Sequence, residues 1–213
     1  MAYPSKIDRE TITDAALGLV EREGADALTL RRLAKDLNVT ANALYRYYDR
    51  LDVLVAATAD AVARRLHDAI EDGMAEFTDS VSARDRVRQL LDIYARFAGE
   101  NPALYGLFLS ADQEAGASLP EPRYHELPWG QSIATVRPLV GEQDAPAATV
   151  TMWGMVHGIW ALRQAGVLGG QEAERSGRLC VRRDHRRTGA GVMERGIGLA
   201  ISDAYGGFEN AIS

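Results

Sequence analysis

The sequence TLRRLAKDLNVTANALYRYY, residues 29–48, decides the fold, because its pattern predicts two helices joined by a tight turn. Thr29 is a residue type that caps helix N-termini. The apolar residues after it recur at i, i+3, i+4 and i+7, the spacing of one helix face: Leu30, Leu33, Ala34 and Leu37. Asn38 tolerates the left-handed backbone that ends a helix. We therefore expect a buried turn residue at Val39 and a second, very short helix capped by Thr40.

The two predicted helices present polar side chains on their outer faces. On the first helix this face holds Arg31, Arg32 and Lys35. On the short helix Leu44 points inward, and the outward residues are Ala41, Asn42, Tyr45 and Arg46, with Tyr47 and Tyr48 just after. A short helix that exposes small, amide and phenolic groups suits a DNA major groove. The alternative is a helical hairpin with a solvated basic face.

This arrangement resembles the DNA-binding domain of the TetR family of transcriptional regulators. The resemblance covers roughly residues 8–55 and rests on LTLRRLAKDLNVT, on ALYRYY, and on the long helix that starts at once afterwards. Residues 44–48, LYRYY, stand where the family usually has a leucine, two aromatic-rich positions, a histidine and a phenylalanine. The family often opens the next helix with a lysine that contacts a phosphate. Here Leu51 occupies that position, and Arg50 beside it is the candidate substitute.

The resemblance implies an all-α fold with two parts. Residues 1–50 would form a three-helix, helix-turn-helix DNA-binding domain, and residues 51–213 a helical bundle for ligand binding and dimerisation. The predicted DNA-binding residues are Thr29, Arg31, Thr40, Ala41, Asn42, Tyr45, Arg46, Tyr47 and Arg50. Among them we expect Thr29, Thr40 and Tyr45 to hold phosphates. Asn42 would reach a base edge, adenine being the partner that an asparagine amide fits best.

Charge is distributed unevenly along the chain. Its 213 residues carry a net charge of −6, which argues against a protein that coats nucleic acid in general. The stretch 31–50, however, holds five basic residues and two acidic ones. A small basic patch on an acidic body favours specific DNA binding over nonspecific coating.

Cysteine content and hydropathy bound the cellular context. Cys180 is the only cysteine, so an intrachain disulfide is excluded, which is compatible with a reducing cytoplasm. The N-terminus, MAYPSKIDRE, lacks the apolar run of a signal peptide. We expect a cytoplasmic protein without a membrane span, because the chain contains no uninterrupted apolar run of about 18 residues.

Periodicity and breaking residues predict further helices along the chain. A bracing helix over about residues 8–23 would be capped by Ser5 with Asp8 and ended by Gly24. A long helix would cover residues 51–77, and the next would run from a cap at Ser82 to the Asn101–Pro102 pair. Shorter helices are expected over 104–108 and 129–140, a long loop over 113–128, and further helices over 146–166 and 192–205.

The C-terminal part carries a second resemblance, to the WHG-type C-terminal domain of some TetR regulators. It rests on Trp153, His157 and Gly158 and on the stretch YARFAGENPALYGLF, residues 94–108. Aromatic side chains with few polar tips could line an effector pocket. The predicted effector-binding residues are Tyr94, Phe97, Phe108, Trp153 and His157. The alternative for each is an ordinary place in the core. The arginine-rich segment 177–188 fits a mobile loop, a divergent segment or a second DNA-binding patch.

The sequence holds no motif for enzymatic or cofactor chemistry. It contains no phosphate-binding or dinucleotide-binding glycine loop, no HExxH and no CxxC. The four histidines have no partner at metal-ligand spacing: His67, His125, His157 and His185. We therefore expect no catalytic residue, no metal and no cofactor.

Together these patterns predict a ligand-responsive transcriptional regulator, and the family resemblance favours a repressor. The expected partners are double-stranded operator DNA, a second copy of the chain, and a small apolar or aromatic effector. Helix-turn-helix proteins usually read two half-sites as dimers, and residues 146–166 and 192–205 would supply the interface. The first rival is a DNA-binding architectural protein without an effector. The second is an enzyme that carries a helix-turn-helix by chance.

Overall fold

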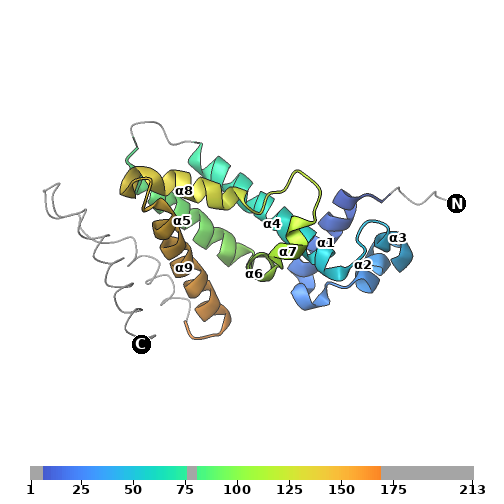
Figure 1. Ribbon diagram of the computed structural model, residues 1–213. Coiled ribbons are helices and arrows are strands. Elements are labelled where there is room, and N and C mark those ends of the chain that lie inside the picture. The colour runs from blue at the N-terminus through green and yellow to red at the C-terminus, as the bar shows by residue number, and fades with distance from the viewer. Residues whose placement is uncertain (1–6, 76–80, 169–213) are drawn as a thin grey trace, which may run out of the picture. The chain divides into compact units, whose positions relative to one another are not determined.

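The computed structural model describes residues 7–75 and 81–168, and every regular element within them is helical. The described residues fall into two compact units, which divide between Thr135 and Val136. The predicted all-α fold class is confirmed. Figure 1 labels the helices, whose bounds are α1 Arg9–Glu23, α2 Leu30–Asp36, α3 Ala41–Tyr45, α4 Leu51–Met74, α5 Ala83–Glu100, α6 Pro102–Ser110, α7 Gln113–Ala117, α8 Leu127–Val140 and α9 Ala145–Gln164.

Helix α1 begins and ends close to its predicted limits. Its N-cap is Asp8, whose carboxylate accepts a hydrogen bond from the Thr11 amide at 2.8 Å. This bond lowers the pKa of Asp8. The predicted capping pair of Ser5 with Asp8 is therefore replaced by Asp8 alone, and Ser5 lies outside the described residues. Gly24 ends the helix with φ at 85°, a left-handed conformation that costs glycine little.

The stretch that decides the fold forms the predicted helix, turn and helix. Thr29 caps α2 by accepting from the Arg32 amide at 3.2 Å. Asn38 adopts φ 54°, as its side chain predicts. Leu44 of α3 is completely buried and holds this short helix against the core. Val39 is half-buried, so the prediction of a buried turn residue there is wrong.

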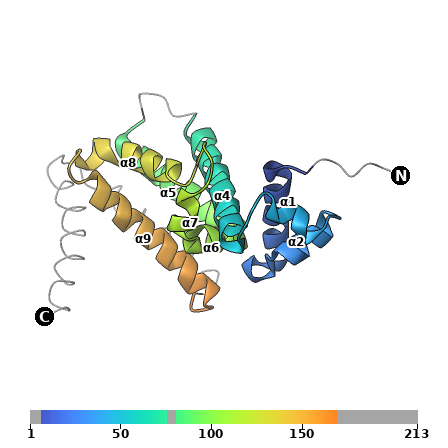
Figure 2. The same cartoon turned by 45° about the vertical axis from the view of Figure 1, so that its right-hand side comes forward.

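Helix α4 starts at the predicted Leu51 and continues to Met74, where Ala75 forms its C-cap. The predicted end at Phe77 lies outside the described residues. Figure 2 shows α1 against this helix, and Arg65 of α4 pairs there with Glu21 of α1. Helix α4 packs against helices on both sides of residue 50, and the predicted division into two domains at that residue stays a prediction.

Helices α5 and α6 follow the predicted breaks. Ser82 caps α5 through the Asp85 amide at 3.2 Å, and Asn101–Pro102 separates the two helices. Figures 1 and 2 both show α5 alongside α4. Gly73 permits this close approach, because a Cβ there would lie 2.6 Å from Cδ1 of Ile93. The first unit therefore has a tightly packed α4–α5 core.

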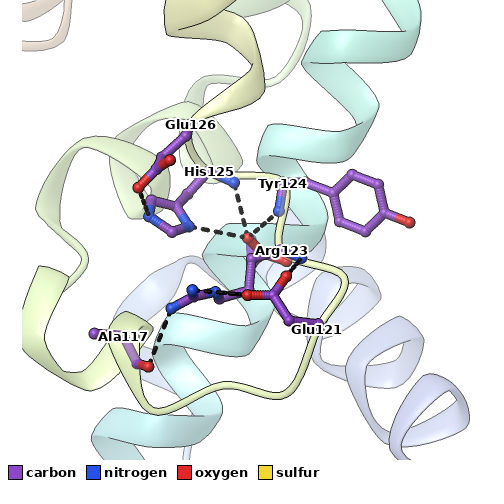
Figure 3. A network of polar contacts seen from close by, with 7 residues as sticks. Ala117, Glu121, Arg123, Tyr124, His125 and Glu126 are labelled. Atoms are coloured by element: carbon purple, nitrogen blue, oxygen red, sulfur yellow. Dashed lines mark hydrogen bonds and ion pairs between the residues drawn. The ribbon is translucent and has the colours of Figure 1, made fainter.

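The predicted long loop over residues 113–128 is only partly a loop. Its first residues form α7, because the Asp112 side chain accepts from the amides of Glu114 and Ala115. Further on, Asp60 of α4 accepts hydrogen bonds from the amides of Tyr124 at 2.7 Å and His125 at 2.9 Å (Figure 3). The segment before α8 is thereby fastened to α4, a long-range contact that local composition does not reveal.

The last described helices agree with the predicted pattern. Helix α8 begins at Leu127, two residues before the predicted start. Helix α9 has Pro146 in its first turn, and Gly166 follows its end with φ at 69°. In the described residues no helix is long and apolar enough to cross a membrane. The predicted helix over 192–205, the segment 177–188 and Cys180 lie outside the described residues.

Candidate nucleic-acid interface

Helix α3 presents the side chains that were predicted to meet DNA. Asn42, Tyr45 and Arg46 are exposed, and the Tyr45 side chain is 50% exposed despite its large apolar ring. Ala41 is half-buried, and its small side chain offers little area for contact. Since Leu44 is fully buried on the opposite side, the helix cannot rotate without opening the core. The packing of Leu44 therefore determines which side chains of α3 point outward.

Two threonines, Thr29 before α2 and Thr40 before α3, carry hydroxyl groups that could donate to a phosphate. Thr29 uses its oxygen as an acceptor for the Arg32 amide, which leaves its hydroxyl proton available. Thr40 stands at the N-cap position of α3, and its side chain forms no capping bond in the described contacts. Both residues are exposed. Both hydroxyls therefore have a proton that they can donate, and their role as phosphate donors stays a prediction.

Not every basic residue near α3 is available for DNA. Arg32 pairs with Glu23 at 2.6 Å and with Asp36 at 3.6 Å. Arg31, Lys35 and Arg46 are exposed, and none is ion-paired within the described part of the chain. Arg32, on the predicted outer face of α2, is thus already engaged by two carboxylates. A count of charged residues in the sequence does not show which cations form ion pairs in the folded protein.

Arg50, predicted to contact a phosphate in place of the missing lysine, forms an ion pair with Asp52. Its guanidinium donates to the Asp52 carboxylate through two nitrogens, with Nε at 3.0 Å from Oδ1. The hydrogen bond raises the pKa of Arg50 and lowers the pKa of Asp52. A DNA phosphate would have to compete with Asp52 for this cation.

Tyr47 also differs from Tyr45. Its hydroxyl donates to the Ile7 carbonyl at 2.6 Å, and its side chain is half-buried. No local pattern in the sequence predicts this bond, which joins residues 40 positions apart. The structure thus separates the predicted DNA-binding residues into groups that are free to donate and groups that are already engaged.

The predicted effector-binding residues fall in both compact units. In the first, Tyr94 is 1% exposed, and its hydroxyl lies 3.3 Å from the Pro128 carbonyl and from Ser132 Oγ. Phe97 and Phe108 both contact Tyr105, with ring centroids 6.4 and 6.2 Å apart. Burial raises the pKa of the Tyr105 phenol. Phe97 and Phe108 thus lie on the ring of Tyr105, a residue that the predicted set omitted.

The other two predicted effector residues are neighbours on α9. The Trp153 and His157 rings lie 5.7 Å apart, one turn of helix from each other, and both side chains are half-buried. Burial lowers the pKa of His157. Among the described residues no cluster of histidine, cysteine and carboxylate side chains is placed to hold a metal ion.

Comparison with known proteins identifies both parts of the chain. Residues 12–58 match the family model of bacterial regulatory proteins of the tetR family, and residues 87–183 match a tetracycline repressor-like C-terminal domain. The second match includes both segments that carry the second resemblance. An uncharacterized HTH-type transcriptional regulator of Mycobacterium tuberculosis is 29% identical over 173 residues, which is 79% of this chain and 75% of the relative.

Solved structures share the fold. A TetR variant of Acinetobacter baumannii in complex with minocycline aligns with a TM-score of 0.60 at 19% identity, covering 98% of this chain and 99% of its own. A BioQ structure with its natural double-stranded DNA operator aligns with a TM-score of 0.59 at 19% identity, covering 83% of this chain and 96% of its own. TetR regulators bind DNA and are not enzymes, so both predictions are confirmed at the level of the family. The chain belongs to the TetR family of bacterial transcriptional regulators.

Proposed function

We propose that this chain is a ligand-responsive repressor that binds operator DNA as a homodimer and is released by a small apolar or aromatic effector. The observation that carries the DNA-binding part is the outward set on α3, Asn42, Tyr45 and Arg46, held by buried Leu44. An exposed amide on a short helix can donate to and accept from one adenine edge. The neighbouring hydroxyls and cations then fix the helix on the phosphates.

Each DNA-binding residue has a role that its surroundings permit. Asn42 reads a base edge, and Thr29, Thr40 and Tyr45 donate hydroxyl protons to phosphates. Arg31 and Arg46 supply charge, and Ala41 lets α3 approach the groove closely. The experiment is a selection of duplexes from a random pool, followed by binding of the chosen duplex to wild-type protein and to Arg46→Ala. We expect Arg46→Ala to weaken binding to all sequences alike and to flatten the dependence on salt.

The small size of α3 supports a homodimer. Helix α3 has five residues and can contact only a few base pairs, so adequate specificity needs a second half-site. Helix α9 supports a self-interface, because Val150 and Leu162 are 53% and 43% exposed. Light scattering at micromolar concentration should give a dimer mass. Leu162→Arg should give monomers, and Gln143→Arg, a matched change at an exposed residue before α9, should not. A monomeric wild-type protein would refute the proposal.

An effector would act by shifting the population of conformations. It can displace the DNA only by binding the released form more tightly than the bound form. The aromatic residues of the two units support a small apolar or aromatic molecule, and the minocycline complex of a TetR protein supports effector binding on this fold. A compound screen by thermal shift, with operator release as the second readout, tests this part.

The same aromatic residues also support the rival architectural role. Tyr94 is nearly inaccessible, and its hydroxyl already has two oxygen neighbours, as expected of a core residue. If compounds that raise the melting temperature leave operator affinity unchanged, the effector part is refuted. DNA binding would stand in that case, and the architectural role would replace regulation by a ligand.

A further inference from the structure

The two tyrosines that follow α3 bind the beginning of α1. The Tyr47 hydroxyl donates to the Ile7 carbonyl at 2.6 Å. The Tyr48 and Thr13 hydroxyls lie 3.0 Å apart, and Thr13 donates its own proton to the Arg9 carbonyl at 2.7 Å. Since Thr13 has no second proton, Tyr48 is the donor in that pair. Two phenolic protons thus join the end of α3 to the start of α1.

These bonds settle what the Tyr47 hydroxyl can do. A phenol has one proton, and phosphodiester oxygens are acceptors only. Because the Tyr47 proton goes to Ile7, this hydroxyl has none left for a phosphate. Tyr45 is 50% exposed and has no side-chain hydrogen bond in the described contacts, so its proton remains available. Of these two tyrosines, only Tyr45 therefore has a hydroxyl proton that it can donate to a phosphate.

The ring of Tyr48 also contacts a cation, Arg9, at the start of α1. The Arg9 guanidinium lies 4.8 Å from the centre of the Tyr48 ring, the geometry of a cation–π contact. Stacking occupies the face of the planar guanidinium and leaves its N–H edges free to donate. Arg9 is exposed, and within the described part of the chain it is not ion-paired. Arg32 and Arg50, in contrast, already hold carboxylates.

We propose that Arg9 contacts a DNA phosphate, and that Tyr47 and Tyr48 are positioning residues that hold it beside α3. The proposal rests on the proposed function, since it adds a contact to the same operator complex. Arg9 joins Arg31, Lys35 and Arg46 as a cation available to the backbone. Tyr47 leaves the predicted set of direct contacts and acts through the start of α1.

Salt dependence tests the contact of Arg9 with a phosphate. Each neutralised phosphate adds about 0.9 to the slope of log affinity against log salt on duplex DNA. With the duplex selected by the wild-type protein, Arg9→Ala should lose about one such increment and bind at least about threefold more weakly. Arg22→Ala is the matched control, because Arg22 is on the same helix but pairs with Asp36 at 3.7 Å. Its slope should stay at the wild-type value.

Tyr47→Phe keeps the ring and removes the proton, so it should weaken binding through Arg9 and lower the slope by no more than Arg9→Ala does. Its effect should shrink in the Arg9→Ala background, because no cation is left to position, and such non-additivity is measurable in a double-mutant cycle. A residue that served only the stability of the fold would give additive effects. Melting temperatures verify that each variant folds.

Two results would overturn the inference: an unchanged slope for Arg9→Ala, and an equal loss of slope for Arg22→Ala. Additive effects of Tyr47→Phe and Arg9→Ala would refute the positioning role alone. If the wild-type protein selects no duplex at any salt concentration, the proposed function itself fails, which is a distinct outcome.

Discussion

Replacing Asp60 by alanine should loosen the segment that leads into α8. The Asp60 carboxylate, whose side chain is only 12% exposed, accepts the amide protons of Tyr124 and His125 at 2.7 and 2.9 Å. The Tyr124 ring is also held by Arg64 of α4, whose guanidinium lies 5.2 Å from the ring centre. With alanine at position 60 the two amides lose their only described acceptor, while the ring contact remains.

The magnitude follows from the two bonds. Hydrogen bonds to a charged group contribute about 1.5–3 kcal/mol each. Tyr124 and His125 are half-buried, so water can replace part of the loss. We therefore expect Asp60→Ala to lower the local stability by about 1.5–3 kcal/mol in total. Asp60→Asn keeps one acceptor oxygen without the charge, and neutral bonds contribute about 0.5–1.5 kcal/mol, so it should lose roughly half as much.

Amide hydrogen exchange of a peptide that covers residues 118–127 measures this loss directly. A change of 1.4 kcal/mol is tenfold, so exchange should be about 10- to 100-fold faster in Asp60→Ala. Asp68→Ala is the matched control, since Asp68 is an exposed acid on the same helix and the change has the same charge and helix propensity. If Asp60→Ala exchanges like Asp68→Ala, the two amides do not depend on this carboxylate, and the reasoning is refuted.

Three further predictions concern stability. Leu44→Ala removes a fully buried side chain, so it should cost about 2–5 kcal/mol in urea unfolding and abolish operator binding; a loss below 1 kcal/mol would mean that α3 is not held by the core. Ser82→Ala should cost about 1 kcal/mol by removing the α5 cap, and an unchanged urea midpoint would contradict this. Burial lowers the pKa of His157, so the unfolded chain binds its proton first as pH falls. Stability should therefore decrease below neutral pH, and His157→Gln should show less of this decrease.

Local physics predicted the helix-turn-helix well. Thr29, Asn38 and Leu44 each act through rules that depend only on nearby residues: a cap, a left-handed backbone and a position on a helix face. The same is true of Ser82 as the cap of α5. Such features need no knowledge of the tertiary fold, and they placed the start of α3 directly after Thr40.

Features that depend on distant partners could not be predicted in this way. A count of charged residues did not show that Arg32 is already paired with Glu23, which lies at the end of α1. Asp60 reaches amides more than 60 positions away, and Tyr47 reaches a carbonyl 40 positions away. The α7 helix was missed because Gly116 and the nearby prolines suggested a loop, whereas the Asp112 cap is enough for one short helix.

The binding of Asn42→Ala to the selected operator tests the central claim most directly. The asparagine amide is exposed on α3, and its loss should cost about 1–3 kcal/mol of operator affinity and relax base preference at one position in each half-site. Competition among duplexes that differ at single positions, measured for wild type and variant at one salt concentration, gives both quantities. We predict weaker binding with preference lost at that position alone. Unchanged affinity and unchanged preference in a folded Asn42→Ala protein would show that α3 does not read the DNA.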